Sequence, residues 1–443
     1  MKAYTQPIPN LETLSQSAST STHQINGKGR LVLKGGRLID PKNGIDAMRD
    51  LAVRDGSIVE VAENITGNAQ DTLLNCQDLV VMPGLIDIHV HLGDLFDVYE
   101  SPLFKAAKDG VTLGLSPGAG NTFMAPALLG AEVDRGVPLN AGVYLGGAAV
   151  LGSSLDTHEL TALFTKTLEP DVMSQRLTRN AITNSTAHLV VGIKDHMGHF
   201  IMPDEKIDLL FEVTAQSNLI YMSHTQDPEH AKRMTFLSRG RPLHLAHATA
   251  AGCGIHGDPV KGFKAVMDLV DGENITAEFV SSMLCKNRGR RDGMKIHLDA
   301  QALAYRALQD RKVKIIISDG QSSATMKGFG NTADNLPCLF TLAEQEVLSL
   351  SDAVATMTQH PAAFLSQRLG APFFAEKCGH LAPGAYANIT VADPLSQRAI
   401  YTIVNSALAA FEGSLVREGF GAGCLVSKYG FSPQSGVGLL PLY

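Results

Sequence analysis

Two histidines separated by a single residue follow an apolar run early in the chain. His89 and His91 come after the apolar residues 84–86. Side chains alternate between the two faces of a strand, so both imidazoles point to the same side. Imidazole is a common ligand of zinc and other divalent ions, although a lone His-x-His pair also fits one core and one surface histidine. The spacing makes this pair a candidate for metal binding.

Four later apolar runs also end in a residue that can bind a metal. These residues are Lys194 after 189–193, His224 after 219–223, His247 after 243–246, and Asp319 after 315–318. Each is weak evidence alone, because polar residues are common at strand ends. Together with the histidine pair, they fall in order on the first, fourth, fifth, sixth and eighth of a series of apolar runs. We interpret this joint pattern as one metal-binding site.

Lys194 is an unexpected residue type at the end of an apolar strand. Its ammonium group would be repelled by a nearby metal ion unless the charge were removed or inverted. Reaction of the amine with carbon dioxide would give a carbamate, whose oxygens could bridge two cations. The alternative is an ordinary lysine whose amine reaches solvent at the mouth of the fold.

The apolar runs alternate with segments of helical length. The runs are residues 85–88, 111–115, 141–145, 189–193, 219–222, 243–246, 275–279 and 315–317. This alternation predicts an α/β fold, a parallel (β/α)₈ barrel of the TIM type. Near-continuous apolar strands fit a parallel sheet that is buried on both faces. In such barrels the carboxyl ends of the strands carry the active site, which is where the candidate ligands would lie.

Short strand-like runs separated by turns occur before and after the barrel segment. They predict a small β-sandwich built from both ends of the chain, over residues 28–80 and 374–443, with the metal-dependent hydrolase barrel over 81–373. In the second part the strand-like runs are residues 381–384, 389–391, 400–404 and 415–416. Residues 1–27 are rich in Ser and Thr, and we expect them to form a flexible tail.

Composition excludes several classes of function. The chain has 443 residues, 44% of them hydrophobic, and Lys+Arg 37 against Asp+Glu 44 gives a net charge of −7. No basic cluster suits a nucleic acid, and no apolar run reaches the roughly 18 residues of a membrane helix. The six cysteines form no C-x-x-C pair, which is typical of reduced thiols. We therefore expect a cytoplasmic protein that acts on a small molecule and binds neither nucleic acid nor membrane.

The pattern resembles the amidohydrolase superfamily over nearly the whole chain. The matching segments are residues 32–59, 81–91, 109–112, 245–249, 274–278, 317–319, 360–362 and 381–384. The most similar branch is that of the cyclic amidohydrolases, the dihydroorotase- and hydantoinase-like group, together with the N-acyl deacetylases. The resemblance implies a hydrolase of carbon–nitrogen bonds other than peptide bonds (EC 3.5), most simply of a cyclic amide or imide. It also favours a homo-oligomer.

The same resemblance implies a role for each candidate ligand. His89 and His91 would hold the buried metal ion, and His224 and His247 would hold a second ion. Lys194, carbamylated by CO₂, would bridge the two. Asp319 would contact the first ion and shuttle the proton of a metal-bridging hydroxide as the catalytic residue. Zinc fits this ligand set, and manganese, cobalt or iron are also compatible with it.

Departures from the family pattern bear on the substrate. Gly93 stands where dihydroorotase-like proteins carry an arginine that holds the substrate carboxylate, so dihydroorotate is disfavoured. Candidate substrate contacts are Asn121, His196, Lys286, Arg288 and Gln321. Each of these also fits a turn, a surface position or a solvated loop. His244 is interpreted as a residue of the core or of the layer behind the ligands.

Three other functions remain open. A deacetylase of N-acyl amino compounds, or an esterase, would use the same site. A single-metal deaminase is disfavoured, because it would need no bridge at Lys194 and no His-x-x-Glu acid follows the fifth strand. A catalytically dead binding or assembly module is disfavoured because this chain keeps all of the candidate ligands.

Overall fold

The computed structural model describes residues 29–92, 102–117, 121–196, 202–285, 294–320, 329–416 and 422–433. The tail predicted over 1–27 lies outside these residues, as do Gly93, Lys286, Arg288 and Gln321. Within the described ranges, no helix has both the length and the apolar character that crossing a bilayer requires.

Eight parallel strands form the centre of the fold, and each matches one predicted apolar run. In sheet order they are β6 (Leu85–Asp87), β7 (Val111–Ser116), β8 (Asn140–Gly146), β9 (Gly192–Asp195), β10 (Ile220–His224), β11 (Leu243–Ala246), β12 (Ile275–Val280) and β13 (Ile315–Ile317). The first and last strands meet beyond their carboxyl ends. There Asp319 N–H donates to the His89 carbonyl at 3.0 Å, and His91 N–H donates to the Gly320 carbonyl at 2.9 Å. The predicted barrel is confirmed.

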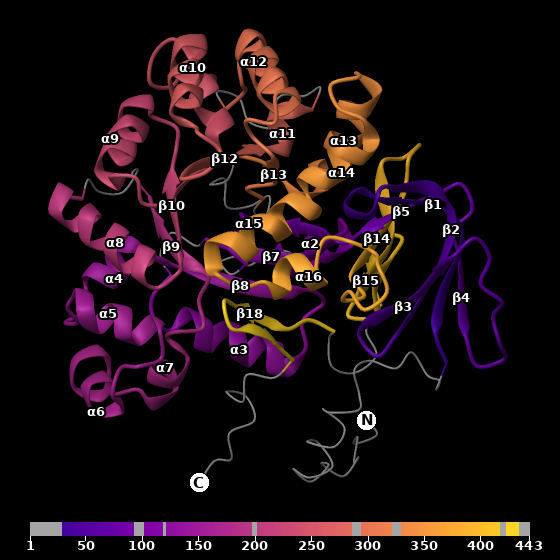
Figure 1. Cartoon of the computed structure of the whole chain (residues 1–443), viewed down its shortest axis with the longest axis horizontal. Helices are drawn as coiled ribbons and strands as arrows, with labels where there is room; N and C mark the ends of the chain where they lie inside the picture. The colour runs from indigo at the N-terminus through magenta and orange to yellow at the C-terminus, as the bar shows by residue number, and fades with distance from the viewer. Residues whose placement is uncertain are drawn as a thin grey trace, which may run out of the picture.

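Helices surround this barrel and connect its strands (Figure 1). Between strands lie α2 (Pro102–Lys108), α3 (Ala125–Arg135), α4 (Gly147–Leu151), α5 (Thr157–Phe164), α6 (Pro170–Val172), α7 (Ala181–Thr186), α8 (Asp204–Gln216), α9 (Pro228–Ser238), α10 (Pro259–Leu269), α11 (Ser281–Leu284) and α12 (Leu298–Gln309). After β13 come α13 (Asn335–Glu344), α14 (Leu350–Thr356), α15 (Gln359–Leu369) and α16 (Phe373–Lys377). Most of their apolar faces share one large buried core with the barrel strands, and α2 packs with parts of α3, β7 and β8 in a smaller cluster.

A second sheet, here called the terminal sheet, joins strands from both ends of the chain. Its order is β17 (Ser414–Leu415), β16 (Ala407–Phe411), β15 (Arg398–Val404), β14 (Ile389–Asp393), β5 (Val80–Pro83), β1 (Leu31–Asp40), β2 (Ile45–Arg54) and β3 (Ser57–Ala62), with β4 (Thr72–Asn75) paired to β1. In Figure 1 the indigo and yellow-orange strands of this sheet lie beside the barrel. The predicted composite β-domain is therefore present.

The structure differs from the predicted organisation in two places. The hairpin of β18 (Leu425–Ser427) and β19 (Gly430–Ser432) pairs with barrel strand β8, whereas the sequence pattern predicts that residues 374–443 all belong to the terminal β-domain. Residues 381–384 form a turn and not a strand, and Leu381 N–H donates to Asp40 Oδ2 at 2.8 Å. Periodicity identifies a strand but does not say which edge it pairs with, and the carboxylate of Asp40 stabilises the turn.

Gly84 connects the terminal sheet to the first barrel strand. A Cβ atom at this position would lie 2.2 Å from the hydroxyl oxygen of Thr112 on β7. Only glycine allows so close an approach between the two segments. This junction fixes where β6 begins, and hence where His89 and His91 leave the barrel.

Candidate functional site

Three buried residues meet where the first and last barrel strands end. His89 Nε2 lies 3.0 Å from Asp319 Oδ1, and His91 Nε2 lies 3.3 Å from the same oxygen. One ligand atom of each residue lies within 4.8 Å of those of the other two. These are the ligand types that divalent transition metals prefer.

The hydrogen bonds around this cluster leave several nitrogen and oxygen lone pairs available to bind a cation. The second ring nitrogen of His89, Nδ1, is bonded to the carboxylate of Glu278. Nε2 and Asp319 Oδ1 both carry lone pairs, so a proton or a metal ion must be shared between them. His91 Nδ1 and His247 Nδ1 are buried and find no hydrogen-bond partner within the described part of the chain. The donor set therefore fits a metal ion.

Lys194 on β9 points its amine into the same cluster. The residue is only 1% exposed, and its Nζ lies 3.0 Å from His89 Nε2. Burial lowers the pKa of Lys194 to about 8, although Asp319 and Glu278 oppose that shift. A larger share of this amine is therefore neutral than in an ordinary lysine, and the neutral amine is the form that reacts with CO₂.

His224 and His247 complete the group of six predicted ligands. Their ring centroids are 4.5 Å apart, and the ring of His247 is 5.1 Å from that of His89. His247 directly follows β11 with a left-handed backbone, φ 39°. Such strained non-glycine residues cluster at functional sites. The structure thus brings the six side chains to one end of the barrel, and their roles as metal ligands stay predictions.

Asp319 is held in place by neighbouring backbone. It also has a left-handed backbone, with φ 45°, and its Oδ2 accepts the N–H of Phe329 at 2.7 Å. Burial alone would raise the pKa of Asp319, but His89 and His91 outweigh it and hold the pKa well below the usual range. The carboxylate is therefore ionised at neutral pH.

Three buried carboxylates behind the ligands were not singled out as site residues from the sequence. Asp87 accepts the main-chain N–H groups of His89 and Ser318, and Asp195 accepts that of His224. The Oε1 atom of Glu278 on β12 is hydrogen-bonded directly to His89 Nδ1. Glu278 lies in the 274–278 segment that resembles the family. An acidic residue within an apolar barrel strand is the sequence signal that could have identified it. Burial would raise the pKa of Glu278, but His89 and His244 lower it to about 2.

Phe329 is a further site residue that sequence reasoning missed. Its ring centroid lies 4.8 Å from that of His247 and 6.1 Å from that of His224. The side chain is 5% exposed and borders the two imidazoles. No signal in the sequence marks it, because it follows a segment without a motif.

The predicted substrate contacts have different surroundings. His196 is half-buried beside the site, with its ring 6.4 Å from that of His224, and its buried Nδ1 finds no partner within the described ranges. The Asn121 amide group donates to the carbonyls of Ser116 and Tyr144, which ties it to β7 and β8. Neither observation tests contact with a substrate.

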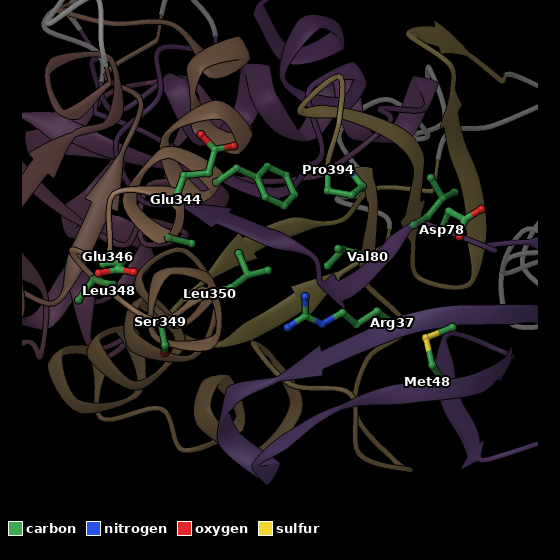
Figure 2. Close-up of a pocket in the computed structure, with 13 residues that line it drawn as sticks. Arg37, Met48, Asp78, Val80, Glu344, Glu346, Leu348, Ser349, Leu350 and Pro394 are labelled. Atoms are coloured by element: carbon green, nitrogen blue, oxygen red, sulfur yellow. The ribbon is translucent and has the colours of Figure 1, made fainter.

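A cavity of about 710 Å³ lies elsewhere, between the terminal sheet and helices α13 and α14. Figure 2 shows Arg37, Met48, Glu344 and Leu350 among the side chains around it. No histidine lines this cavity, and Arg37 is already paired with Asp46. Its chemistry does not match that of the barrel cluster.

Relatives of known name match the chain over most of its length. A dihydroorotase of Trichlorobacter lovleyi is 24% identical over 417 residues, which cover 86% of this chain and 92% of the relative. A dihydroorotase of Geobacter sulfurreducens is 25% identical over 368 residues, covering 76% and 85% respectively.

Solved structures share the fold at low sequence identity. A D-hydantoinase superposes with a TM-score of 0.66 at 14% identity, covering 90% of this chain and 100% of that one. A dihydropyrimidinase from Brevibacillus agri gives a TM-score of 0.64 at 14% identity, covering 92% and 99%. These neighbours support the barrel with its terminal β-domain.

A family model described as the amidohydrolase family matches residues 80–417. That span contains the whole barrel, all six predicted ligands and part of the terminal sheet. The family is metal-dependent, in agreement with the candidate metal site of His89, His91 and Asp319. The chain belongs to the amidohydrolase family, which confirms the predicted hydrolase of carbon–nitrogen bonds.

Proposed function

We propose that this protein uses two metal ions to hydrolyse a C–N bond in a cyclic amide or imide. The observation that carries the proposal is the convergence of six side chains, one of them a buried lysine, beyond the carboxyl ends of the barrel strands. A buried lysine amine within 3.0 Å of a candidate ligand serves no evident packing purpose. Conversion of the Lys194 amine to a carbamate would give this buried side chain a role as a metal ligand.

The six candidate ligands would bind metal ions at two adjacent positions. His89, His91 and Asp319 would hold the first ion, and His224 and His247 the second, with carbamylated Lys194 between them. When bound, divalent ions such as zinc polarise a carbonyl and make water nucleophilic near neutral pH. Asp319, oriented by the Phe329 N–H group, would take up a proton and return it to the leaving nitrogen.

The substrate class follows from the relatives and from one departure. The names of the relatives and structural neighbours refer to dihydroorotate, hydantoin and dihydropyrimidine, all cyclic amides. Gly93 stands at the sequence position where dihydroorotase-like proteins carry the arginine that binds the substrate carboxylate. This difference argues against dihydroorotate itself as the substrate. We therefore propose a small cyclic amide or imide without that carboxylate.

The test combines metal analysis with a substrate panel. Protein loaded with zinc in the presence of bicarbonate should contain close to two ions per chain and open a hydantoin, a cyclic imide or a lactam. Asp319→Asn should lower the rate by about 10²- to 10⁴-fold, as expected for loss of a proton shuttle. Hydrolysis of N-acyl amino acids alone would favour the deacetylase, one ion per chain the deaminase, and no ion the binding module.

A further inference from the structure

Glu278 is a fully buried carboxylate on β12 that makes three hydrogen bonds around the candidate metal site. Its Oε1 accepts the ring Nδ1–H of His89 and, at 3.2 Å, the main-chain N–H of His247. Its Oε2 bonds His244 Nε2 at 3.0 Å. An ionised carboxylate is costly to bury unless partners satisfy its lone pairs, and here three do so.

The chemistry of a carboxylate fixes the proton on His89. An ionised carboxylate only accepts hydrogen bonds, so the proton at this contact must reside on His89 Nδ1. Nε2 is then the ring nitrogen that can bind a metal. Nε2 is also the nitrogen that lies 3.0 Å from both Asp319 Oδ1 and Lys194 Nζ. Glu278 thus directs the ligating nitrogen towards the site.

A second chain of hydrogen bonds holds Glu278 from the other side. His244 Nδ1 lies 2.9 Å from Thr276 Oγ1, which also accepts Arg368 Nη2 at 3.3 Å. Because Glu278 takes the Nε2 proton of a neutral His244, Thr276 must donate its hydroxyl proton to Nδ1. The Phe364 ring packs 4.6 Å from the His244 ring and restricts its rotation. The Thr276 hydroxyl and His244 Nε2–H therefore each donate towards Glu278 or its partner, in one consistent direction.

We infer that Glu278 is a positioning residue which, supported by His244 and Thr276, fixes the orientation and tautomer of His89 for metal binding. This inference rests on the proposed function, because it takes His89 to be a ligand. Glu278 also fixes the backbone of His247, so a single carboxylate connects the residues assigned to both metal positions. Partners of this kind, behind the ligands, typically change metal affinity or activity by roughly 10- to 100-fold.

The test is Glu278→Gln, with Glu273→Gln as the matched control. Glu273 is exposed just before the same strand, so its variant removes one charge outside the cluster. Chelator competition should show zinc bound roughly 10- to 100-fold more weakly by Glu278→Gln, with Glu273→Gln unchanged. In zinc-loaded protein labelled with ¹⁵N-histidine, the His89 Nδ1–H signal should be present in the wild type and shifted or lost in Glu278→Gln.

Thr276→Val and Thr276→Ser give a second route if Glu278→Gln does not fold. Valine removes the hydroxyl at nearly constant shape and should weaken zinc binding several-fold, and serine should restore it. Equal zinc affinity and an unchanged Nδ1–H signal in Glu278→Gln, or in Thr276→Val, would overturn the inference while leaving the proposed function intact. Failure of the wild type to bind zinc would overturn both.

Discussion

Lys194 shows how one buried charge can indicate a covalent change. The ammonium form is penalised by burial and lies against candidate ligands that would carry positive ions. Lys194→Ala should therefore reduce bound zinc from about two ions towards one and lower hydrolysis by about 10- to 100-fold or more. Metal analysis and initial rates measure both effects, and Lys206→Ala, on the exposed face of α8, is the control.

Removal of CO₂ should reproduce the Lys194→Ala effect in the wild type. Bicarbonate should reverse it in the wild type but not in the variant. Full metal content and activity in Lys194→Ala would contradict the assigned role of this lysine.

The residue types of the candidate site could be predicted, but their partners could not. The His89–His91 spacing and the polar ends of apolar strands identified all six side chains that the structure brings together. The bonds from Glu278 to His89 and His244 escaped prediction, because they join three strands that are distant in sequence. Only the folded barrel brings such residues into contact.

At the scale of elements, the hairpin β18–β19 is attached to the barrel by a cluster around Tyr429. The ring of Tyr429 lies 5.7 Å from that of His188, and its hydroxyl donates to the Phe164 carbonyl at 2.6 Å. Lys166 Nζ lies 3.7 Å from the centroid of the same ring. Burial, together with Lys166 and Lys428, lowers the pKa of His188 to about 4. The cluster therefore contains a histidine that resists protonation.

This cluster predicts a pH dependence of stability. The unfolded chain, in which His188 has a pKa of about 6.5, binds the proton more tightly than the folded chain does. Stability should thus fall as the pH drops from about 6.5 to 4, by roughly 1 kcal/mol after allowance for partial exposure. Melting temperatures across that range should show a shallower slope in His188→Gln, and His158→Gln, an exposed control, should keep the wild-type slope. Identical slopes in all three proteins would refute this view of the hairpin.

The hairpin also shows that the sequence predicts where strands lie but not which strands they pair with. Apolar runs that alternate with segments of helical length predicted the position of every barrel strand, because each strand must be buried on both faces. A strand as short as β18 carries no sequence signal for its partner. It pairs with Ala141 and Gly142 of β8, whereas β9 pairs with the later residues 144–146 of that strand. Pairing between distant segments is decided by the assembled fold.

At the scale of the whole molecule, buried asparagines connect the barrel to the terminal sheet. Asn405, after β15, donates from its amide to Asn140 Oδ1 on β8 at 2.9 Å and to the Ala422 carbonyl at 2.8 Å. Its main-chain N–H donates to Asn388 Oδ1 at 2.9 Å. These bonds tie segments from both parts of the chain together.

Asn405→Ala should destabilise the protein by about 1–3 kcal/mol, because it leaves buried polar groups of Asn140 and Ala422 without one of their partners. The chain contains no tryptophan, so guanidinium unfolding is best followed by circular dichroism. A control is Asn68→Ala in the exposed 66–70 segment, which should change stability little. An unaltered midpoint for Asn405→Ala would show that this network does not couple the two parts.

The proposed two-metal site is tested most directly by anomalous X-ray scattering from crystals grown with zinc and bicarbonate. The predicted result is two peaks per chain, one among His89, His91 and Asp319 and one beside His224 and His247, with extra density on Lys194 Nζ joining them. Peaks confined to other parts of the surface, with an unmodified Lys194 beside metal-free histidines, would contradict it.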